Sequence, residues 1–276
     1  MTAGAWRIII ILKKFAKGRK TMKLTFLGSG HGVPSPDRHC SATLLEVGDK
    51  RYLIDAGAPV VDIMRARGIP VDGLTAVFVT HRHSDHTFGL PMLVNITTWF
   101  YKNADYDIFL PEQICVDAIH MMILASLSGP DDERVRMHVF GAGEVYSDDT
   151  VTVRAIPTNH MNGLHPSYAF VIDASGEGAG ADRGKRVIFT GDLHQGDAAD
   201  FPEIIMTEPS TMLVSELVHF KPEVIIPRFE ACLAEQITVN HYFDPSPKCP
   251  DLEAVLKAGV HSKPICLAHD GYEVEF

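Results

Sequence analysis

The 276-residue sequence is long enough for one large domain or two small ones, and its 46% of apolar residues suffice for a sizeable core. Its formal charge of −10 disfavours a nonspecific nucleic-acid or acidic-membrane surface, because both bind basic footprints. Five widely spaced cysteines without a Cys-x-x-Cys pair favour reduced thiols in a cytoplasmic protein over a disulfide framework. Apolar runs fall well short of the roughly 20 residues that span a bilayer, so stable membrane insertion is not expected.

The first 21 residues differ in composition from the rest of the chain. They contain six basic and no acidic side chains, so the remaining 19 basic and 35 acidic residues give the body a charge of −16. Their apolar run, Ile8 to Leu12, precedes most of the charge, unlike the order in a secretory signal. We expect either an extension upstream of a natural start at Met22, dispensable for chemistry, or an interfacial or oligomer-forming basic amphipathic helix.

From Met22 onward, short apolar stretches alternate with turns, which predicts a sheet within a single domain of residues 22 to 276. The expected strands are Lys23 to Leu27, Thr43 to Val47 and Arg51 to Ile54. The loop from Gly28 to Pro36 is rich in glycine and proline, and either presents backbone N–H groups and His31 to a ligand or is an ordinary turn. Asp55 ends the third strand, and a helix with an apolar face follows.

The chain then reaches a segment dense in metal-ligating side chains. The apolar run Leu74 to Val79 indicates a strand, and it leads into Thr80-His81-Arg82-His83-Ser84-Asp85-His86, with four potential ligands in six residues. Alternate side chains of an extended segment share a face, so His81 and His83 can bind one ion, while Asp85 and His86 can reach a second where the chain turns. Imidazoles with a carboxylate suit Zn²⁺. The alternative is a histidine-rich turn that binds metal adventitiously.

His-x-His-x-Asp-His is the motif of the metallo-β-lactamase superfamily, and the sequence resembles its ribonuclease Z branch in particular. The similar stretches are Met22 to Arg38, Ser41 to Leu45, Leu53 to Gly57 and Asp85 to Pro91. The resemblance covers roughly Met22 to Phe276 and implies an α/β fold, the four-layered αββα sandwich. It also implies that the Gly28 to Pro36 loop borders the active site. Asp55 would support the metal-binding histidines from behind, fixing their tautomer and orientation.

The middle of the chain continues the alternation of strands and helices that such a sandwich needs. We expect a core helix at Leu90 to Phe100, a strand at Tyr106 to Leu110, a helix at Pro111 to Leu127, and two or three strands between residues 135 and 155. The glycine-rich segment Gly176 to Gly184 is predicted to connect a hairpin.

Two further ligands follow from the resemblance. His160 leaves one strand shortly before another and is placed like the third ligand of the first zinc, with His165 in the same loop as its rival or as a substrate-side residue. Asp192 ends the apolar run from Val187 and matches the aspartate that bridges both metals. A shared carboxylate lowers the repulsion between two divalent ions a few ångströms apart.

The proton donor departs from the family pattern. In the segment Met212 to Phe220 the family has a histidine-glutamate pair that helps deliver a proton to the leaving group, but here Ser215 takes the histidine position and Glu216 is retained. His219 is either the substitute donor or a surface residue.

The last metal ligand has two candidates, His241 and His269, because each ends a strand-like run. The resemblance favours His241, since the family's final ligand precedes a helix and a closing strand. Asp251 to Ala258 matches that helix, and Ala268 to Phe276 resembles the strand.

We expect a two-zinc centre, with Mn²⁺ as an alternative metal. The ligands are His81, His83 and His160 on one ion, Asp85, His86 and His241 on the other, and Asp192 between them. Asp85, Asp192, Glu216 and His219 are the expected catalytic residues. The nucleophile is expected to be a hydroxide that bridges the metals, since bound zinc lowers the pKa of water to about 7.

The leading hypothesis is a homodimeric phosphodiesterase that acts on a small substrate. Alternatives are a tRNA 3′-processing endoribonuclease, a hydrolase of lactones, thioesters or β-lactams, and a non-catalytic metal sensor or structural protein. Transfer RNA is disfavoured because the interval from His160 to Asp192 has no room for the arm with which the family grips tRNA. The charge of −16 on the body also offers little affinity for phosphates.

Overall fold

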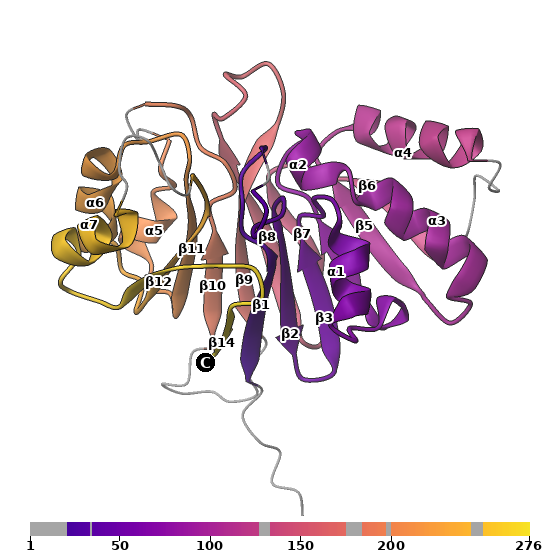
Figure 1. Cartoon of the computed structure of the whole chain (residues 1–276), viewed down its shortest axis with the longest axis horizontal. Helices are drawn as coiled ribbons and strands as arrows, with labels where there is room; N and C mark the ends of the chain where they lie inside the picture. The colour runs from indigo at the N-terminus through magenta and orange to yellow at the C-terminus, as the bar shows by residue number, and fades with distance from the viewer. Residues whose placement is uncertain (1–20, 34, 127–132, 175–183, 197–199, 244–250) are drawn as a thin grey trace, which may run out of the picture.

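The computed structural model describes residues 21–33, 35–126, 133–174, 184–196, 200–243 and 251–276. Two seven-stranded sheets pack face to face, and helices cover the outer face of each (Figure 1). This arrangement confirms the predicted αββα sandwich. The predicted extension and most of the glycine-rich connection lie outside the described residues.

The first sheet has the strand order β14-β1-β2-β3-β4-β5-β6. Its strands are β1 (Met22–Gly28), β2 (Ala42–Val47), β3 (Lys50–Ile54), β4 (Ala76–Phe78), β5 (Tyr106–Leu110), β6 (Val135–Val139) and β14 (Glu273–Glu275). The strands from β3 to β6 run parallel, so each connection must cross over the sheet, and helices form these crossovers. They are α1 (Val60–Ala66), the 3₁₀ turn η1 (Val71–Gly73), α2 (Ser84–Thr87), α3 (Leu90–Phe100) and α4 (Gln113–Ala125).

The second sheet repeats this plan with the order β13-β12-β11-β10-β9-β8-β7. Its strands are β7 (Gly143–Ser147), β8 (Val151–Thr158), β9 (Ser167–Ala174), β10 (Arg186–Phe189), β11 (Met212–Leu217), β12 (Ile237–Tyr242) and β13 (Ile265–Leu267). The strands from β7 to β10 are antiparallel, and those from β10 to β13 are parallel. The crossover helices are α5 (Ile204–Thr207), α6 (Pro222–Ala231) and α7 (Leu252–Gly259).

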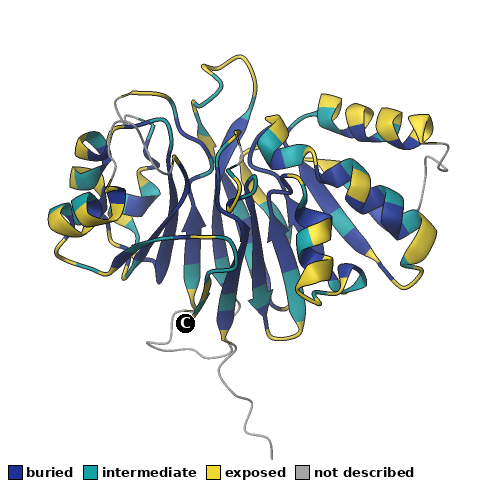
Figure 2. Ribbon diagram, viewed as in Figure 1, coloured by how far each residue is buried: buried dark blue, intermediate teal, exposed yellow. Residues whose placement is uncertain are grey.

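The alternation of side chains along each strand builds three apolar layers. Tyr52 and Phe78 point between the sheets, where Phe78 meets the ring of Phe170 from the second sheet at a centroid distance of 6.0 Å. Their neighbours Leu53 and Val77 point to the outer face and pack under the first group of helices. Each fully buried side chain of this kind stabilises the fold by roughly 1.5–3 kcal/mol. Figure 2 shows the buried sheets between helices whose outward faces are exposed.

Two elements are shorter than predicted. The strand expected at Leu74 to Val79 contains only Ala76–Phe78, because η1 ends directly before Leu74 and its last turn is closed by a bond from the Leu74 N–H to the Val71 carbonyl. The helix expected from Pro111 begins at Gln113, since Glu112 is extended. Within the described part of the chain, no helix is long and apolar enough to cross a membrane.

Candidate metal centre

The segments that carry the predicted ligands meet at one edge of the sandwich. Asp55 follows β3, His81 comes three residues after β4, and Asp192 comes three residues after β10. His160 follows β8, and His241 lies at the end of β12. The carboxyl ends of parallel strands collect side chains from distant parts of the sequence in this way, which is why α/β sheets form sites there.

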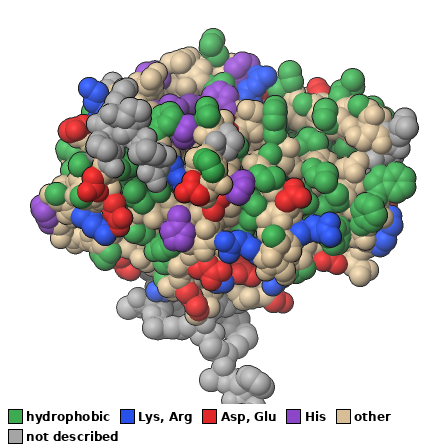
Figure 3. Space-filling model, viewed as in Figure 1, with side chains coloured by type: hydrophobic (Ala, Val, Ile, Leu, Met, Phe, Trp, Pro, Cys, Tyr) green, Lys and Arg blue, Asp and Glu red, His purple; other side chains and the backbone are tan. Residues whose placement is uncertain are grey.

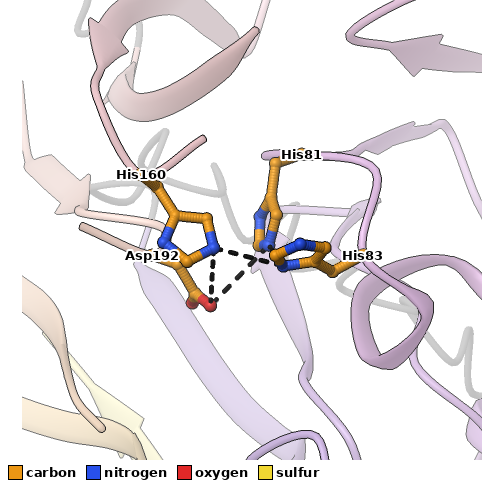
Figure 4. Close-up of side chains that lie close together, drawn as sticks. All are labelled: His81, His83, His160 and Asp192. Atoms are coloured by element: carbon orange, nitrogen blue, oxygen red, sulfur yellow. Dashed lines mark hydrogen bonds and ion pairs between the residues drawn. The ribbon is translucent and has the colours of Figure 1, made fainter. Parts of the chain in front are cut away.

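Four side chains form a first group: His81, His83, His160 and Asp192 (Figure 4). His83 Nδ1 lies 3.0 Å from His81 Nε2 and 3.1 Å from His160 Nε2. Asp192 Oδ2 lies 3.7 Å from the Nε2 atom of both His81 and His160. Four ligands placed tetrahedrally at about 2.0–2.1 Å from a zinc ion would stand about 3.3 Å apart, so these spacings fit one ion.

Hydrogen bonds behind these rings fix which nitrogen faces the group. The Thr80 hydroxyl donates to Asp55, so its oxygen accepts from His81 Nδ1–H at 3.0 Å. His160 Nδ1–H donates to the Leu193 carbonyl at 3.0 Å. The Nε2 atoms of His81 and His160 therefore carry lone pairs, and both lone pairs point into the first group. Such atoms cannot satisfy one another, but a bound cation satisfies them together.

The second group is Asp85, His86 and His241. Asp85 Oδ2 lies 3.6 Å from His86 Nε2 and 3.8 Å from His241 Nε2. Asp192 also faces this group, since its Oδ1 is 3.5 Å from His86 Nε2 and its Oδ2 is 3.3 Å from His241 Nε2. One carboxylate thus adjoins both groups, as expected of a bridging ligand.

Unpaired polar atoms at the centre fit a metal as well. His86 Nε2 and Asp192 Oδ1 are buried and have no hydrogen-bond partner. Leaving a buried polar atom unpaired costs about 1–3 kcal/mol, so two in one place are unfavourable without a ligand. Nitrogen and oxygen donors in these two groups fit a pair of divalent ions of the zinc type.

Asp55 organises the centre from behind. Its carboxylate accepts hydrogen bonds from the Thr80 N–H at 2.8 Å and from His86 Nδ1–H at 2.7 Å, which turns His86 Nε2 towards Asp192. Asp55 and His241 both have left-handed backbone conformations, with φ of 57° and 49°. Such conformations cost of order 1–3 kcal/mol in residues other than glycine and cluster at functional sites. Asp55 therefore connects the chain before His81 with the ring of His86.

Burial and opposite charges set the protonation of the centre. Burial, reinforced by the neighbouring His86, lowers the pKa of His81 well below its ordinary value. Burial also acts on His86, but the carboxylates of Asp55 and Asp192 raise its pKa well above the ordinary value. Although burial opposes ionisation of Asp192, His241 and His86 hold its pKa well below the usual range.

The proton-donor candidate His219 lies beside the ligand rings. Its ring centroid is 4.7 Å from that of His160 and 6.4 Å from that of His241. Glu216 Oε1 accepts from His219 Nδ1–H at 2.8 Å and also from the Leu193 N–H at 3.0 Å. The buried carboxylate of Glu216 therefore supports His219 and the chain after Asp192, and Ser215 only bonds to the backbone.

The other candidate histidines lie outside both ligand groups. His31 packs on the ring of Phe243 at a centroid distance of 3.8 Å, and burial lowers its pKa. His165 accepts from Arg82 Nη1 at 2.9 Å. His269 packs on Tyr272, with ring centroids 5.6 Å apart.

Sequence reasoning missed two aspartates that hold the walls of the site. Asp270 accepts from the Ser29 N–H and hydroxyl, both at 2.9 Å, and from the His39 N–H at 2.8 Å. This bond pattern fixes the glycine-rich loop, whose Ser29 carbonyl accepts from the His241 N–H. Asp200 accepts from the Asn159 N–H next to His160 at 2.7 Å. No local signal marks either residue, because each partner is distant in sequence.

The sandwich and its paired ligand groups define a protein of the metallo-β-lactamase superfamily, of the ribonuclease Z-like kind. Its fold matches the metallo-β-lactamase fold protein YhfI from Bacillus subtilis with a TM-score of 0.71 and 19% identity, over 93% of this chain and 100% of that chain. It also matches the short form of human tRNase Z with a TM-score of 0.68 and 20% identity, over 91% of this chain and 98% of that chain.

The family model of the Anti-Pycsar protein Apyc1 matches residues 22–252, and the chain belongs to this family. Among curated relatives, the ribonuclease Z of Mycobacterium bovis BCG is 31% identical over 171 residues, which are 56% of this chain and 60% of that enzyme. The match thus spans less than two thirds of the relative's length.

Proposed function

We propose that the protein is a dinuclear zinc-dependent hydrolase that cleaves small phosphodiesters, with Mn²⁺ as a possible replacement for zinc. The observation that carries this proposal is the position of Asp192, whose carboxylate adjoins both ligand groups. Seven potential ligands, one of them a shared carboxylate, are more than a structural site for a single ion needs. When bound, the two ions would supply the nucleophile by lowering the pKa of water to about 7, and would polarise the attacked oxygen.

The chain itself contributes orientation and proton transfer. Asp55 and the Leu193 carbonyl hold His86 and His160 with their lone pairs towards the centre. His219 is proposed to protonate the leaving group from Nε2, since its Nδ1–H is engaged by Glu216. Burial alone would lower the pKa of His219, but Glu216 raises it above the ordinary value, which favours the protonated donor form. Glu216 acts in this scheme as a positioning residue.

A small substrate is favoured over tRNA by the connection between His160 and Asp192. Its described residues form a short loop and the antiparallel pair β9 and β10, and residues 175–183 are the part outside them. A segment this short has no length for an RNA-gripping arm. The body of the chain also carries a charge of −16, which repels a polyanion.

The catalytic domain in this proposal is residues 22–276, with residues 1–21 as an extension that is dispensable for chemistry. We further propose a cytoplasmic homodimer as the working form. A substrate panel tests the reaction: zinc-loaded protein is assayed with small phosphodiesters, a lactone, a thioester, a β-lactam and a precursor tRNA. The proposal expects the highest kcat/KM for a small phosphodiester. Faster, strongly salt-dependent cleavage of the tRNA 3′ trailer would replace it with a tRNA-processing role, and no turnover of any substrate would favour a sensor.

A further inference from the structure

We infer that Arg38 is a positioning residue for the second ligand group, because its guanidinium fixes the two pieces of backbone that hold His241. The inference rests on the two-metal centre proposed above, and it adds the residue that keeps one of the proposed ligands in place.

The position of Arg38 is unusual for a cationic side chain. It is the only lysine or arginine among the buried side chains in the described part of the chain, with 4% of its surface exposed. Long cationic side chains normally lie at the surface, where Figure 3 shows Lys and Arg side chains. Removing a cation from water is costly unless other groups replace the water. The partners of the guanidinium among the described residues are two carbonyls and one aromatic ring.

These partners enclose His241. Arg38 Nη1 donates to the Ser29 carbonyl at 3.3 Å, and Nη2 donates to the Tyr242 carbonyl at 2.8 Å. The guanidinium also lies over the ring of Tyr242, with Cζ 3.9 Å from the ring centroid. The Ser29 carbonyl in turn accepts from the His241 N–H at 2.9 Å. Arg38 therefore joins the glycine-rich loop, which binds the His241 amide, to the residue that follows His241.

The backbone at His241 needs this support because it leaves the regular strand. The pairing of β12 with β11 shifts register between Ser215 and Leu217, where β12 contains one residue more than β11. Such a bulge redirects a side chain and interrupts the ladder of backbone bonds. His241 lies in the bulge with a left-handed φ of 49°, which is unfavourable for a residue other than glycine. The bond from Arg38 to the Tyr242 carbonyl stabilises the chain directly after this point.

The contacts use features that arginine has and lysine lacks. A planar guanidinium presents its donors in a rigid fork, so one side chain can bond two carbonyls and also lie flat on a ring. Lysine keeps the charge, but its compact ammonium stands on a flexible stem and cannot lie flat. Methionine is unbranched and apolar, and it offers no donor to either carbonyl. Arg38→Lys and Arg38→Met therefore separate the charge of Arg38 from its fork.

Calorimetric titration of the metal-free protein with zinc tests the inference. The wild type should show two binding steps. Arg38→Met should weaken the step that His241→Ala removes by about 10–100-fold and change the other less than about 3-fold, because removing a residue behind a metal ligand acts on that ligand's ion. Arg38→Lys should weaken the same step at least about 5-fold, since it lacks the fork.

Arg186→Met is the matched control for these variants. The Arg186 side chain is 20% exposed and pairs with Asp173 and Glu208, at the end of β10 remote from Asp192. This variant also removes a largely buried guanidinium, but it touches none of the proposed ligands. It should bind both zinc ions as the wild type does.

Hydrogen exchange of the metal-free protein gives a second readout that uses no zinc. The His241 amide should exchange at least about 10-fold faster in Arg38→Met than in the wild type, while amides in the middle of β9 keep their wild-type protection. Circular dichroism identifies a variant that fails to fold. If Arg38→Met is unfolded, Arg38→Lys serves in both measurements.

Three results would overturn the inference: equal weakening of both zinc steps, wild-type zinc affinity in Arg38→Met or Arg38→Lys, or unchanged exchange of the His241 amide. A wild type that binds a single ion would instead contradict the proposed two-metal centre. Hydrogen exchange would then still decide whether Arg38 holds His241 in place.

Discussion

His241 and His269 show how the fold separates two residues that look alike in sequence. Both follow apolar runs, yet His241 lies 3.3 Å from Asp192 through its Nε2 atom, while His269 packs on Tyr272 outside the ligand groups. We predict that His241→Ala loses one of two bound zinc ions and that His269→Ala keeps both. Metal analysis after dialysis measures this directly. If only the His269 variant loses metal, the two assignments must be exchanged.

His219 allows the proton donor to be tested by choice of leaving group. An alkoxide needs a proton as it departs, whereas p-nitrophenolate does not. We predict that His219→Ala lowers kcat for a diester with an alkyl leaving group by about 10²–10⁴-fold, but changes turnover of bis(p-nitrophenyl) phosphate less than 10-fold.

Ser215→Ala is the control for His219, because Ser215 occupies the family's histidine position and bonds only to backbone. It should leave both rates near those of the wild type. An equal loss on both substrates in His219→Ala would mean that His219 supports the metal centre rather than delivering a proton.

At the residue scale, sequence reasoning named side chains that the structure brings together where they are close in sequence or match a motif. The segment from His81 to His86 indicates metal binding by its residue types and spacing, and the structure places its potential ligands in two groups. It failed where a residue acts through a distant partner. Asp270 holds Ser29 across 241 positions, and its sequence neighbours give no sign of that contact.

At the scale of elements, a polar cluster joins the two sheets at the edge remote from the metals. Asp148, in the turn between β7 and β8, accepts from Tyr52 Oη at 2.7 Å and from Lys50 Nζ at 2.9 Å, both in β3. It also accepts from the Val151 N–H at 2.8 Å. Burial opposes ionisation, but these donors lower the pKa of Asp148 to about 2.

The depressed pKa makes this cluster a source of acid sensitivity. The stability it contributes is complete above the ordinary pKa of 3.8 and is lost as the pH falls through about 2. We predict that Asp148→Asn lowers the free energy of unfolding at pH 7 by about 1–2 kcal/mol, after allowance for solvent screening, and flattens its pH dependence between pH 4 and 2. Urea denaturation at several pH values measures both.

Asp149→Asn is the matched control, because Asp149 is exposed and pairs with the same lysine, Lys50, as Asp148 does. Its unfolding free energy should change by less than about 0.5 kcal/mol. Parallel pH curves for the wild type and Asp148→Asn would show that the cluster does not link the sheets.

Element prediction was accurate for type and less so for boundaries and exposure. The helix Leu90–Phe100 was predicted with its bounds, since its apolar run is long and ends at a turn. The exposure of this helix was not predicted, because a high proportion of apolar residues by itself indicates a buried helix. Met92 is instead 51% exposed. The strand Ala76–Phe78 is shorter than its apolar run predicted, because a neighbouring turn takes up the first residues of that run.

At the scale of the whole molecule, every proposed ligand follows the start of β1 at Met22. We therefore predict that deleting residues 1–21 leaves the rate per bound metal within about two-fold of the wild type, because the deletion removes none of the groups at the centre. Steady-state kinetics normalised to zinc content provides the measurement. A truncated protein that folds and binds zinc but has lost most of its rate would show that the extension contributes to the site or to its assembly.

A zinc titration of the metal-free protein distinguishes a two-metal hydrolase from a protein that uses one ion or none. Turnover of bis(p-nitrophenyl) phosphate is measured as zinc is added, with Asp192→Ala as the comparison. The two ligand groups predict a rate that rises to a plateau at two equivalents per wild-type chain, and a rate at least about 10²-fold lower in the variant, because Asp192 adjoins both groups. A plateau at one equivalent with full activity, or no turnover at any zinc concentration, would contradict a two-metal hydrolase.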